Sequence, residues 1–325
     1  MEIIVLFTDT HFGVKNNSMT WLQSQLDFIY KQFIPELTEL KRSHPKDRVN
    51  LIHLGDVFDS RSTISTYVAT KVREAFLELR SVVDEFDIIA GNHDYYSPNT
   101  DEVCSIDLLL EGLGINLHTK DSYITLDGDL YLPWYQYQEI EKVTRLVESG
   151  VAKRLFTHAD IVSNIVPYKN VPIYSGHIHT PYIDKYRKLY NLGSCYSINF
   201  ADANQQRGYY IITNDSYEFV PNTKSIRFYR LYNEEIFNND LSLFNCNDYI
   251  ELYISETNMV KEKYIEEIKL YTEKFSHLWI IPKIEERSTS LDNGFEIYNI
   301  ESIIESVIPE DLKEYFNKVK NNITQ

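Results

Sequence analysis

The 325-residue sequence predicts an α/β protein in which two sheets form a sandwich with helices outside it. Short runs rich in Ile, Val, Leu, Phe and Tyr recur along the first half and are typical of buried, parallel strands. Helical patterns lie between these runs, and strand followed by helix, repeated, favours a largely parallel sheet covered by helices. After Gly176 the chain changes to short strands separated by turn residues. We therefore interpret residues 1–235 as one two-sheet sandwich.

Three stretches inside this sandwich have helical spacing, and a fourth has a hairpin signal. The expected helices cover 18–40, 64–81 and 104–113. The first of them opens on Ser18, a residue type that is common at helix N-caps. Residues 119–135 hold the pair Asp127-Gly128 between two β-rich runs, which is typical of a tight hairpin turn.

A second unit is expected after the sandwich. Residues 245–290 contain a strand pattern in "DYIELYISE", a helical pattern in "NMVKEKYIEEIKLYTEKF" and another strand pattern in "HLWIIPKIEER". That order predicts a small β-α-β capping module. Residues 296–325 have helical spacing, with Pro309 opening a second helix because proline suits the first turn. We therefore expect C-terminal helices beyond the module.

The composition, 43% hydrophobic and 25% charged, is ordinary for a soluble protein. No apolar stretch approaches the roughly 20 residues that span a membrane, and the N-terminus enters a strand without a secretory signal. Three widely spaced cysteines do not suggest a disulfide framework or a zinc cluster. We therefore expect a cytoplasmic protein with reduced thiols and no membrane contact.

Polar side chains follow five of the apolar runs, at the point where each run ends. They are Asp9 and His11, Asp56 and Asp59, Asn92 with His93 and Asp94, His158, and His177 with His179. In layered α/β proteins, ligands bind at the carboxyl ends of the strands. We therefore expect the five strand ends to converge on one crevice.

Seven of these groups have the chemistry of metal ligands, namely Asp9, His11, Asp56, Asn92, His158, His177 and His179. A mixture of oxygen and imidazole nitrogen suits Mn, Fe or Zn better than Ca or Mg. Seven groups are too many for one catalytic ion, but they fit two ions that share a bridging carboxylate. Paired ions about 3.5–4 Å apart are the usual apparatus of phosphoester hydrolysis.

Each motif taken alone also has an ordinary structural explanation. A pair such as Asp9-x-His11 is common, and a lone histidine such as His158 is more often structural than functional. His177-x-His179 is firmer, because alternate residues that leave a strand face the same way. The rare tetrapeptide Gly-Asn-His-Asp, together with the order of all the motifs, favours a common site.

The net charge of −16 is concentrated toward the C-terminal end. Residues 231–325 hold 9 Lys and Arg against 19 Asp and Glu, whereas residues 1–230 hold 23 against 29. An acidic protein is a poor default binder of nucleic acid, since phosphate contacts need basic side chains. Two bound divalent cations would change that balance at the site itself.

The series Asp-x-His, Gly-Asp-x-x-Asp, Gly-Asn-His-Asp, a lone histidine after a strand, and Gly-His-x-His resembles the motif set of the calcineurin-like metallophosphoesterases. Within that superfamily the chain is similar to the SbcD-type DNA-repair nucleases (the meiotic recombination eleven family), above all to the short versions in tailed phages. The resemblance is carried by "TDTHFGVK", "GDVFDSR", "GNHDYY", "LYLPWY", "YSGHIHTP" and "YNLGSCYSINFADANQQRGYYIIT". Beyond about residue 215 it rests only on the capping module and the C-terminal helices.

The resemblance implies a ligand set for each ion. One ion would be held by Asp9, His11, Asp56 and His179, and the other by Asp56, Asn92, His158 and His177. His93 would contact the scissile phosphate as an acid or as a transition-state stabiliser, and we expect Asp94 to orient it. Many relatives have His and then Pro just after the Gly-Asp motif. This chain has Phe58-Asp59-Ser60-Arg61-Ser62 there, so we assign no DNA-positioning imidazole.

The resemblance also implies an activity and its partners. The activity would be that of a Mn²⁺-dependent nuclease, less active with Mg²⁺, that acts as a double-strand exonuclease and a single-strand endonuclease in DNA repair, recombination and replication. The partners would be DNA, a second copy of the chain, and an SbcC-type ABC ATPase of the Rad-fifty family. Helices within 64–81 and 104–113 would form the homodimer, and residues 296–325 would bind the ATPase.

Three alternatives stay open at this point. A metallophosphatase or phosphodiesterase with a non-DNA substrate would use the same ligands. Protein phosphatases of the superfamily, however, carry Gly-Asp-x-x-Asp-Arg-Gly and Gly-Asn-His-Glu, unlike Asp59-Ser60-Arg61 and Gly-Asn-His-Asp here. A non-catalytic scaffold subunit would have lost ligands, whereas all seven positions are occupied. The C-terminal helices, finally, would pack on the capping module if they do not bind an ATPase.

Overall fold

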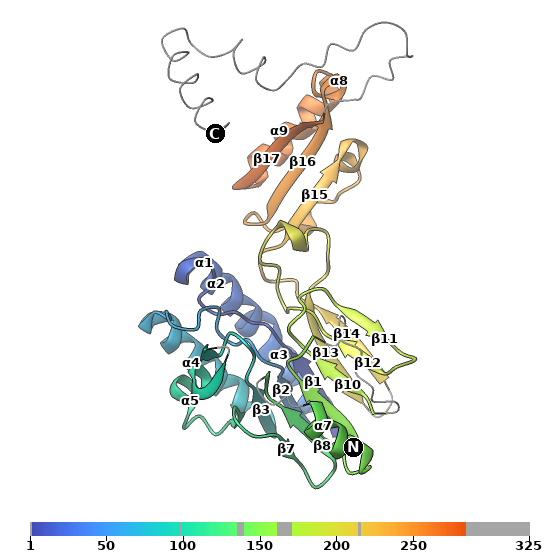
Figure 1. Ribbon diagram of the computed structural model, residues 1–325. Helices are drawn as coiled ribbons and strands as arrows, with labels where there is room; N and C mark the ends of the chain where they lie inside the picture. Colours follow the sequence, from blue (N-terminus) through green and yellow to red (C-terminus); the bar gives the residue numbers. More distant parts are fainter. Residues whose placement is uncertain (1, 98, 135–139, 161–170, 214–215, 284–325) are drawn as a thin grey trace, which may run out of the picture. The chain divides into compact units, whose positions relative to one another are not determined.

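The computed structural model describes residues 2–97, 99–134, 140–160, 171–213 and 216–283. It has the two-sheet α/β sandwich that the sequence predicts, together with a smaller third sheet (Figure 1). The C-terminal segment expected at 296–325 lies outside the described residues. Within the described part of the chain, no helix is both long enough and apolar enough to cross a bilayer.

The first sheet has six strands in the order β14-β13-β1-β2-β3-β6. Their bounds are β14 Ser216–Pro221, β13 Gly208–Thr213, β1 Glu2–Phe7, β2 Arg48–His53, β3 Glu85–Ile89 and β6 Asn116–His118. The strands β1, β2, β3 and β6 are parallel, whereas β13 and β14 add antiparallel to one side. The carboxyl ends of β1, β2 and β3 therefore lie at the same edge of the sheet.

The second sheet also has six strands, in the order β11-β12-β10-β9-β8-β7. Their bounds are β11 Tyr182–Asp184, β12 Leu189–Asn191, β10 Ile173–Ser175, β9 Arg154–Thr157, β8 Asp129–Leu132 and β7 Tyr123–Ile124. The middle strands β12, β10, β9 and β8 are parallel, and β7 and β11 are antiparallel edges. The expected hairpin is confirmed, because β7 and β8 are joined through Gly128 at φ +93°.

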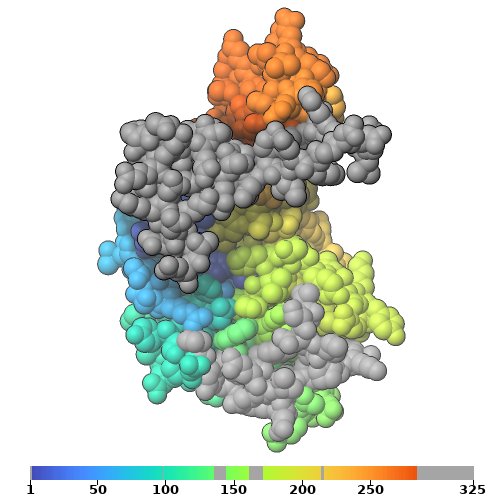
Figure 2. All heavy atoms as spheres, turned by 45° about the horizontal axis from the view of Figure 1, so that its top comes forward, coloured from blue at the N-terminus to red at the C-terminus, as the bar shows by residue number. Residues whose placement is uncertain are grey.

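Both faces of the first sheet are buried, which explains its unbroken apolar runs. On β1, Ile3, Val5 and Phe7 pack in one hydrophobic cluster with the helices, whereas Ile4 and Leu6 pack in another with residues of the second sheet. Successive side chains of a strand point to opposite faces, so one strand supplies both layers. The space-filling view shows the blue-to-teal N-terminal part of the chain beside the yellow-green part, which includes β10, β11 and β12 of the second sheet (Figure 2).

The helices of the first half cover the outer face of the first sheet (Figure 1). They are α1 Val14–Asn17, α2 Met19–Phe28, α3 Ile34–Ser43, α4 Thr66–Ser81 and α5 Ser105–Leu110. A further helix, α7 Ile140–Glu148, comes after β8 in the chain. The helix expected at 18–40 is present, but a π-helical turn at Ile29–Phe33 joins its halves. Pro35 lies just beyond that turn and has no N–H to donate, which accounts for the irregular hydrogen bonding. Ser18 occupies the N-cap position without a side-chain capping bond.

The third sheet is the expected capping module with one additional strand. Its strands β15 Phe228–Tyr232, β16 Tyr249–Ser255 and β17 His277–Lys283 are all parallel. The short α8 Glu256–Met259 and the longer α9 Glu262–Lys274 connect β16 to β17, as the β-α-β pattern predicts. β15 precedes residue 235, so the sheet begins inside the range that the sequence analysis assigned to the sandwich.

Candidate metal centre

The polar residues that follow β1, β2, β3, β9 and β10 converge at the carboxyl ends of these strands. Main-chain hydrogen bonds hold the first two loops together, since the Asp9 N–H donates to the Gly55 carbonyl and the His11 N–H to the Asp56 carbonyl, each at 3.0 Å. The second sheet joins through the His177 N–H, which donates to Asp9 Oδ2 at 3.2 Å. Loops far apart in the sequence therefore share one site, as the sequence predicts.

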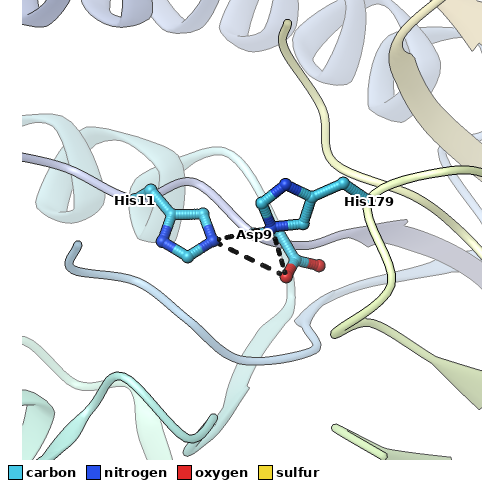
Figure 3. A group of neighbouring side chains, drawn as sticks. All are labelled: Asp9, His11 and His179. Atoms are coloured by element: carbon cyan, nitrogen blue, oxygen red, sulfur yellow. Dashed lines mark hydrogen bonds and ion pairs between the residues drawn. The ribbon is translucent and has the colours of Figure 1, made fainter. Parts of the chain in front are cut away.

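One group of donor atoms consists of Asp9, His11 and His179 (Figure 3). The Nε2 atoms of His11 and His179 are 3.0 Å apart, and they lie 3.8 and 3.6 Å from Asp9 Oδ1. Asp9 Oδ1 is buried and has no hydrogen-bond partner. A carboxylate oxygen and two imidazole nitrogens thus face one another across a space that a cation would fill.

A second group consists of Asp56, His158 and His177, with the amide of Asn92 beside them. Asn92 Oδ1 lies 3.1 Å from His158 Nε2 and 2.9 Å from His177 Nδ1. Asp56 Oδ2 lies 3.2 Å from His158 Nε2 and 3.7 Å from His11 Nε2. The Asp56 carboxylate is therefore placed between the two groups, in the position of a bridging ligand.

Burial and mutual charge set the protonation of these groups. Burial lowers the pKa of His11 to about 3 and that of His177 to about 4, so both imidazoles are neutral and offer lone pairs. Burial opposes ionisation of Asp56, but the charge and hydrogen bond of the neighbouring His158 outweigh it and hold the Asp56 pKa below its usual range. His158 is also disfavoured as a cation by burial, yet the Asp56 carboxylate raises its pKa to about 9.

These groups fit two divalent cations. An orphaned buried carboxylate oxygen, the neutral imidazoles of His11 and His177, and a shared carboxylate are the kinds of donor that such ions bind. The Nδ1–H of His158 donates to the Leu54 carbonyl at 2.6 Å, and this bond leaves Nε2 facing Asp56 and Asn92. A ligand imidazole is commonly oriented in this way through its second nitrogen.

The backbone of the site is strained. Asp9, His11, Asp56 and His177 all have left-handed φ angles, between 40° and 77°. Such angles are uncommon outside glycine and cost of order 1–3 kcal/mol each, so they persist only where the surroundings enforce them. Gly91 belongs to the same constraint, because a Cβ there would collide with the Asp56 carboxylate and main-chain nitrogen.

A family profile, that of the calcineurin-like phosphoesterases, matches residues 3–235. The chain belongs to this family. One solved structure that matches is a protein of unknown function from Aquifex aeolicus, at 15% identity and a TM-score of 0.27. The match covers 53% of this chain and 88% of that one. A comparison with the curated proteins finds no match.

Family membership and the two donor groups identify the chain as a metal-dependent phosphoester hydrolase. Bound divalent ions would supply hydroxide at neutral pH and neutralise the charge that builds up on the phosphoryl oxygens. The contribution of the chain is to hold its donors in place. On one side of the Asp56 carboxylate lie Asp9, His11 and His179. On its other side lie Asn92, His158 and His177.

His93 reaches the edge of the site from a fixed position. Its Nδ1–H donates to the Asp59 carbonyl at 2.6 Å, and its N–H donates to Asp56 Oδ1 at 2.8 Å. Asp59, to which the sequence analysis gave no role, also places its Oδ1 3.6 Å from His11 Nδ1. The motif Gly-Asp-x-x-Asp was the signal that could have identified Asp59, because the turn after β2 brings it back to the site that contains Asp56.

The expectation that Asp94 orients the His93 imidazole is wrong. Its carboxylate instead accepts four main-chain hydrogen bonds, from the N–H groups of Gly91, Asp56, Val57 and Phe58, at 2.8–3.3 Å. These donors come from the two loops that carry Asp56 and Asn92. Asp94 is therefore a buried tie between the loops, and the Asp59 carbonyl orients His93 in its place.

Replacing Asp94 with Ala should lower stability and not only activity. Four buried N–H groups would lose their acceptor, and we expect the free energy of unfolding to fall by about 3 kcal/mol or more. Denaturant unfolding of the metal-free protein measures this loss. The control is Asp27→Ala, which removes surface contacts with Lys31 and Gln23 and should change little. Unchanged stability in Asp94→Ala would contradict the role as a tie.

Proposed function

We propose that the protein is a Mn²⁺-dependent DNA nuclease of the SbcD type that hydrolyses phosphodiester bonds at a two-metal site. In this proposal Asp9, His11, Asp56 and His179 hold one ion, and Asp56, Asn92, His158 and His177 hold the other. The observation that carries the proposal is the position of the Asp56 carboxylate between the two donor groups. An ion pair that shares one carboxylate suits in-line displacement at phosphorus.

The donor chemistry supports manganese over magnesium. Four of the seven proposed ligands are imidazoles, and imidazole suits transition metals, whereas Mg²⁺ prefers oxygen ligands and keeps its water. The number of donors leaves room for water on each ion. We expect Mg²⁺ to support only weak activity.

The motif sequences support DNA as the substrate, by their resemblance to SbcD-type nucleases. The acidic net charge of −16 favours a second candidate, a metallophosphatase or phosphodiesterase that acts on a non-DNA substrate. DNA repair, recombination and replication are the processes that the nuclease proposal implies. Linear duplex DNA, a nitrophenyl phosphodiester and a nitrophenyl monoester, each with Mn²⁺, distinguish these functions. Activity on the monoester alone would contradict the nuclease.

His93 is proposed as the group that acts on the phosphate. The bond from Nδ1 to the Asp59 carbonyl leaves Nε2 available to a substrate oxygen, and the ring lies 5.0 Å from that of His11, centroid to centroid. His93 could also join a group with His11 and Asp59, but in the proposed assignment it is not a metal ligand, so its removal would leave both ligand sets complete. An acid or base positioned in this way contributes about 10²–10⁴-fold to a rate.

His93→Ala should therefore keep two equivalents of Mn²⁺ and lose about 10²–10⁴-fold in the rate of DNA hydrolysis. End-labelled duplex and metal analysis of the purified protein measure both quantities. His44→Ala is the control, because His44 lies at the end of α3 and bonds to Leu40 and Ser43. A His93 variant with normal metal content and a normal rate would remove the proposed role.

We propose a homodimer that forms through α4 and α5. Tyr67 is 51% exposed, Leu77 53% and Leu108 77%, so these two neighbouring helices present large apolar side chains that a partner could cover. Arg73 of α4 donates to the Leu109 carbonyl and so ties the helices together. Other apolar residues of the expected interface, such as Phe76, pack in the chain's own core and are not available to a partner.

Leu108→Glu should convert a dimer into a monomer, because it places a charge in the apolar contact. Light scattering at micromolar concentration measures the mass. Leu126→Glu is the matched control, since Leu126 is fully exposed between β7 and β8. A wild-type protein that is already monomeric would rule the dimer out.

We also propose that residues 296–325, which lie outside the described residues, bind the coiled coil of an SbcC-type ABC ATPase. An amphipathic helix in a partner's groove is a common recognition mode. Deleting 296–325 should leave metal binding and basal nuclease activity unchanged and abolish co-purification with the ATPase. A truncated chain that still binds the ATPase, or one that fails to fold, would show that the segment has a different role.

A further inference from the structure

The loop that carries His179 depends on side chains for its hydrogen bonds. It follows β10 and contains no helix or strand between Gly176 and Pro181, so its carbonyl groups have no ladder partners. Buried main-chain oxygens need partners from elsewhere. The amide of Asn191 donates to the Ile178 carbonyl at 2.7 Å and to the Thr180 carbonyl at 2.9 Å.

Arg207 binds the carbonyl group that lies between those of Ile178 and Thr180. One of its guanidinium nitrogens donates to the carbonyl of His179 itself. Two buried side chains, Asn191 and Arg207, thus bind three consecutive carbonyl groups, with that of His179 in the middle. We call this pair the carbonyl clamp.

The clamp is itself held in place. The Arg207 side chain is only 3% exposed, and its other terminal nitrogen lies 2.5 Å from Asp202 Oδ1 and 2.9 Å from Gln205 Oε1. Asp202 is fixed in turn by the N–H groups of Ile198 and Asn199, at 2.8 and 3.3 Å. The guanidinium therefore has little freedom to move away from the loop.

The segment around Gly193 closes the space behind the same carbonyl. The Ser194 N–H donates to the His179 carbonyl at 3.1 Å, and a Cβ on Gly193 would lie 2.6 Å from that oxygen. The His179 peptide is therefore held from behind by a tight turn and by Arg207 together.

Two of the four histidines proposed as metal ligands, His158 and His179, are held in different ways. His158 is fully buried, and its own ring bonds to the Leu54 carbonyl. The His179 side chain is 34% exposed and sits on an irregular loop. An exposed imidazole on such a loop needs its main chain fixed if its Nε2 is to stay 3.6 Å from Asp9 Oδ1.

We propose that Arg207 and Asn191 are positioning residues for one of the two metal sites, the one that contains Asp9, His11 and His179. This inference rests on the two-metal site of the proposed function. Through the main chain the clamp sets where the His179 imidazole lies, and its hydrogen bonds go to the Ile178, His179 and Thr180 carbonyls rather than to the side chains of Asn92, His158 and His177. The segment "INFADANQQR", for which the proposed chemistry has no other use, supplies Asp202, Gln205 and Arg207 to this structure.

The test is selective loss of one ion in the full-length protein. Arg207→Ala and Asn191→Ala should weaken one Mn²⁺ site by about 10–100-fold, the usual cost of removing a group behind a ligand. The other site should keep the affinity that it has in the wild type. Titration with Mn²⁺ and the electron paramagnetic resonance spectrum of the ion pair measure this without any substrate. Both variants should resemble His179→Ala and not His177→Ala.

Chemical rescue separates positioning from general stability. Arg207 lines a cavity of about 330 Å³, so guanidinium can enter the space that Arg207→Ala leaves. Added guanidinium should restore the weakened Mn²⁺ site in Arg207→Ala but not in His179→Ala. Arg207→Lys keeps a charge beside Asp202 but cannot span both partners, and it should weaken the same site in part. Arg187→Ala, which removes surface contacts with Asp184 and Tyr182, is the matched control.

Several outcomes would overturn the inference. Two Mn²⁺ sites of wild-type affinity in Arg207→Ala would end it and leave the proposed nuclease standing. Equal weakening of both sites would show a general structural role. If Arg207→Ala does not fold, because the buried Asp202 loses its guanidinium partner, normal Mn²⁺ sites in Asn191→Ala and Arg207→Lys decide against the clamp. A wild-type chain that binds no Mn²⁺ would reject the proposed function and this inference together.

Discussion

The carboxylate of Asp94 is the interaction on which the rest of the site depends. It accepts main-chain hydrogen bonds from the loops after β2 and β3, and these loops carry Asp56 and Asn92. Four main-chain hydrogen bonds converge on this one buried side chain, and its loss would leave all four N–H groups without an acceptor. The two loops are therefore tied to each other, and this tie helps to place the Asp56 carboxylate between the two donor groups.

The fixed position of these loops matters for the electrostatics of the site. Carboxylates and imidazoles are gathered in a buried space, where each would be costly alone. The Asp56 carboxylate and the His158 imidazole reduce this cost for each other, as the lowered pKa of Asp56 and the raised pKa of His158 show. His11, in contrast, is made neutral by burial. The imidazoles balance the negative charge of the carboxylates only in part. Cations placed between these donors would neutralise the rest and would give the unpaired Oδ1 of Asp9 a partner.

The left-handed backbone angles of Asp9, His11, Asp56 and His177 follow from the same arrangement. The side chains of a strand point to the two faces of its sheet, but these ligands must turn toward a common point beyond the strand ends. After β1, β2 and β10 the chain makes that turn at the left-handed residues and accepts the strain. Buried hydrogen bonds to Asp94 and to the carbonyl clamp oppose the relaxation of these loops. The candidate metal ligands are thus held in place by polar groups that are not ligands themselves.

The sequence by itself determined much of this protein. Apolar runs followed by Asp9, Asp56, Asn92, His158 and His177 predicted the strands, the convergence of their ends and the mixed donor set. These features are local, because strand spacing, turn chemistry and ligand type are written in consecutive residues. The two sheets and the β-α-β order of the capping module were predictable for the same reason.

Only the tertiary structure decided which polar groups meet. Asp94 and His93 are adjacent in sequence, yet Asp94 bonds to main-chain groups up to 38 residues away and His93 to the Asp59 carbonyl. Arg207 reaches the His179 carbonyl across 28 residues, and β15 pairs with β16 of the capping module. A sequence pattern shows which groups can donate or accept. The partner that each group finds depends on which loops the packing of the sheets brings together, and no local spacing records it.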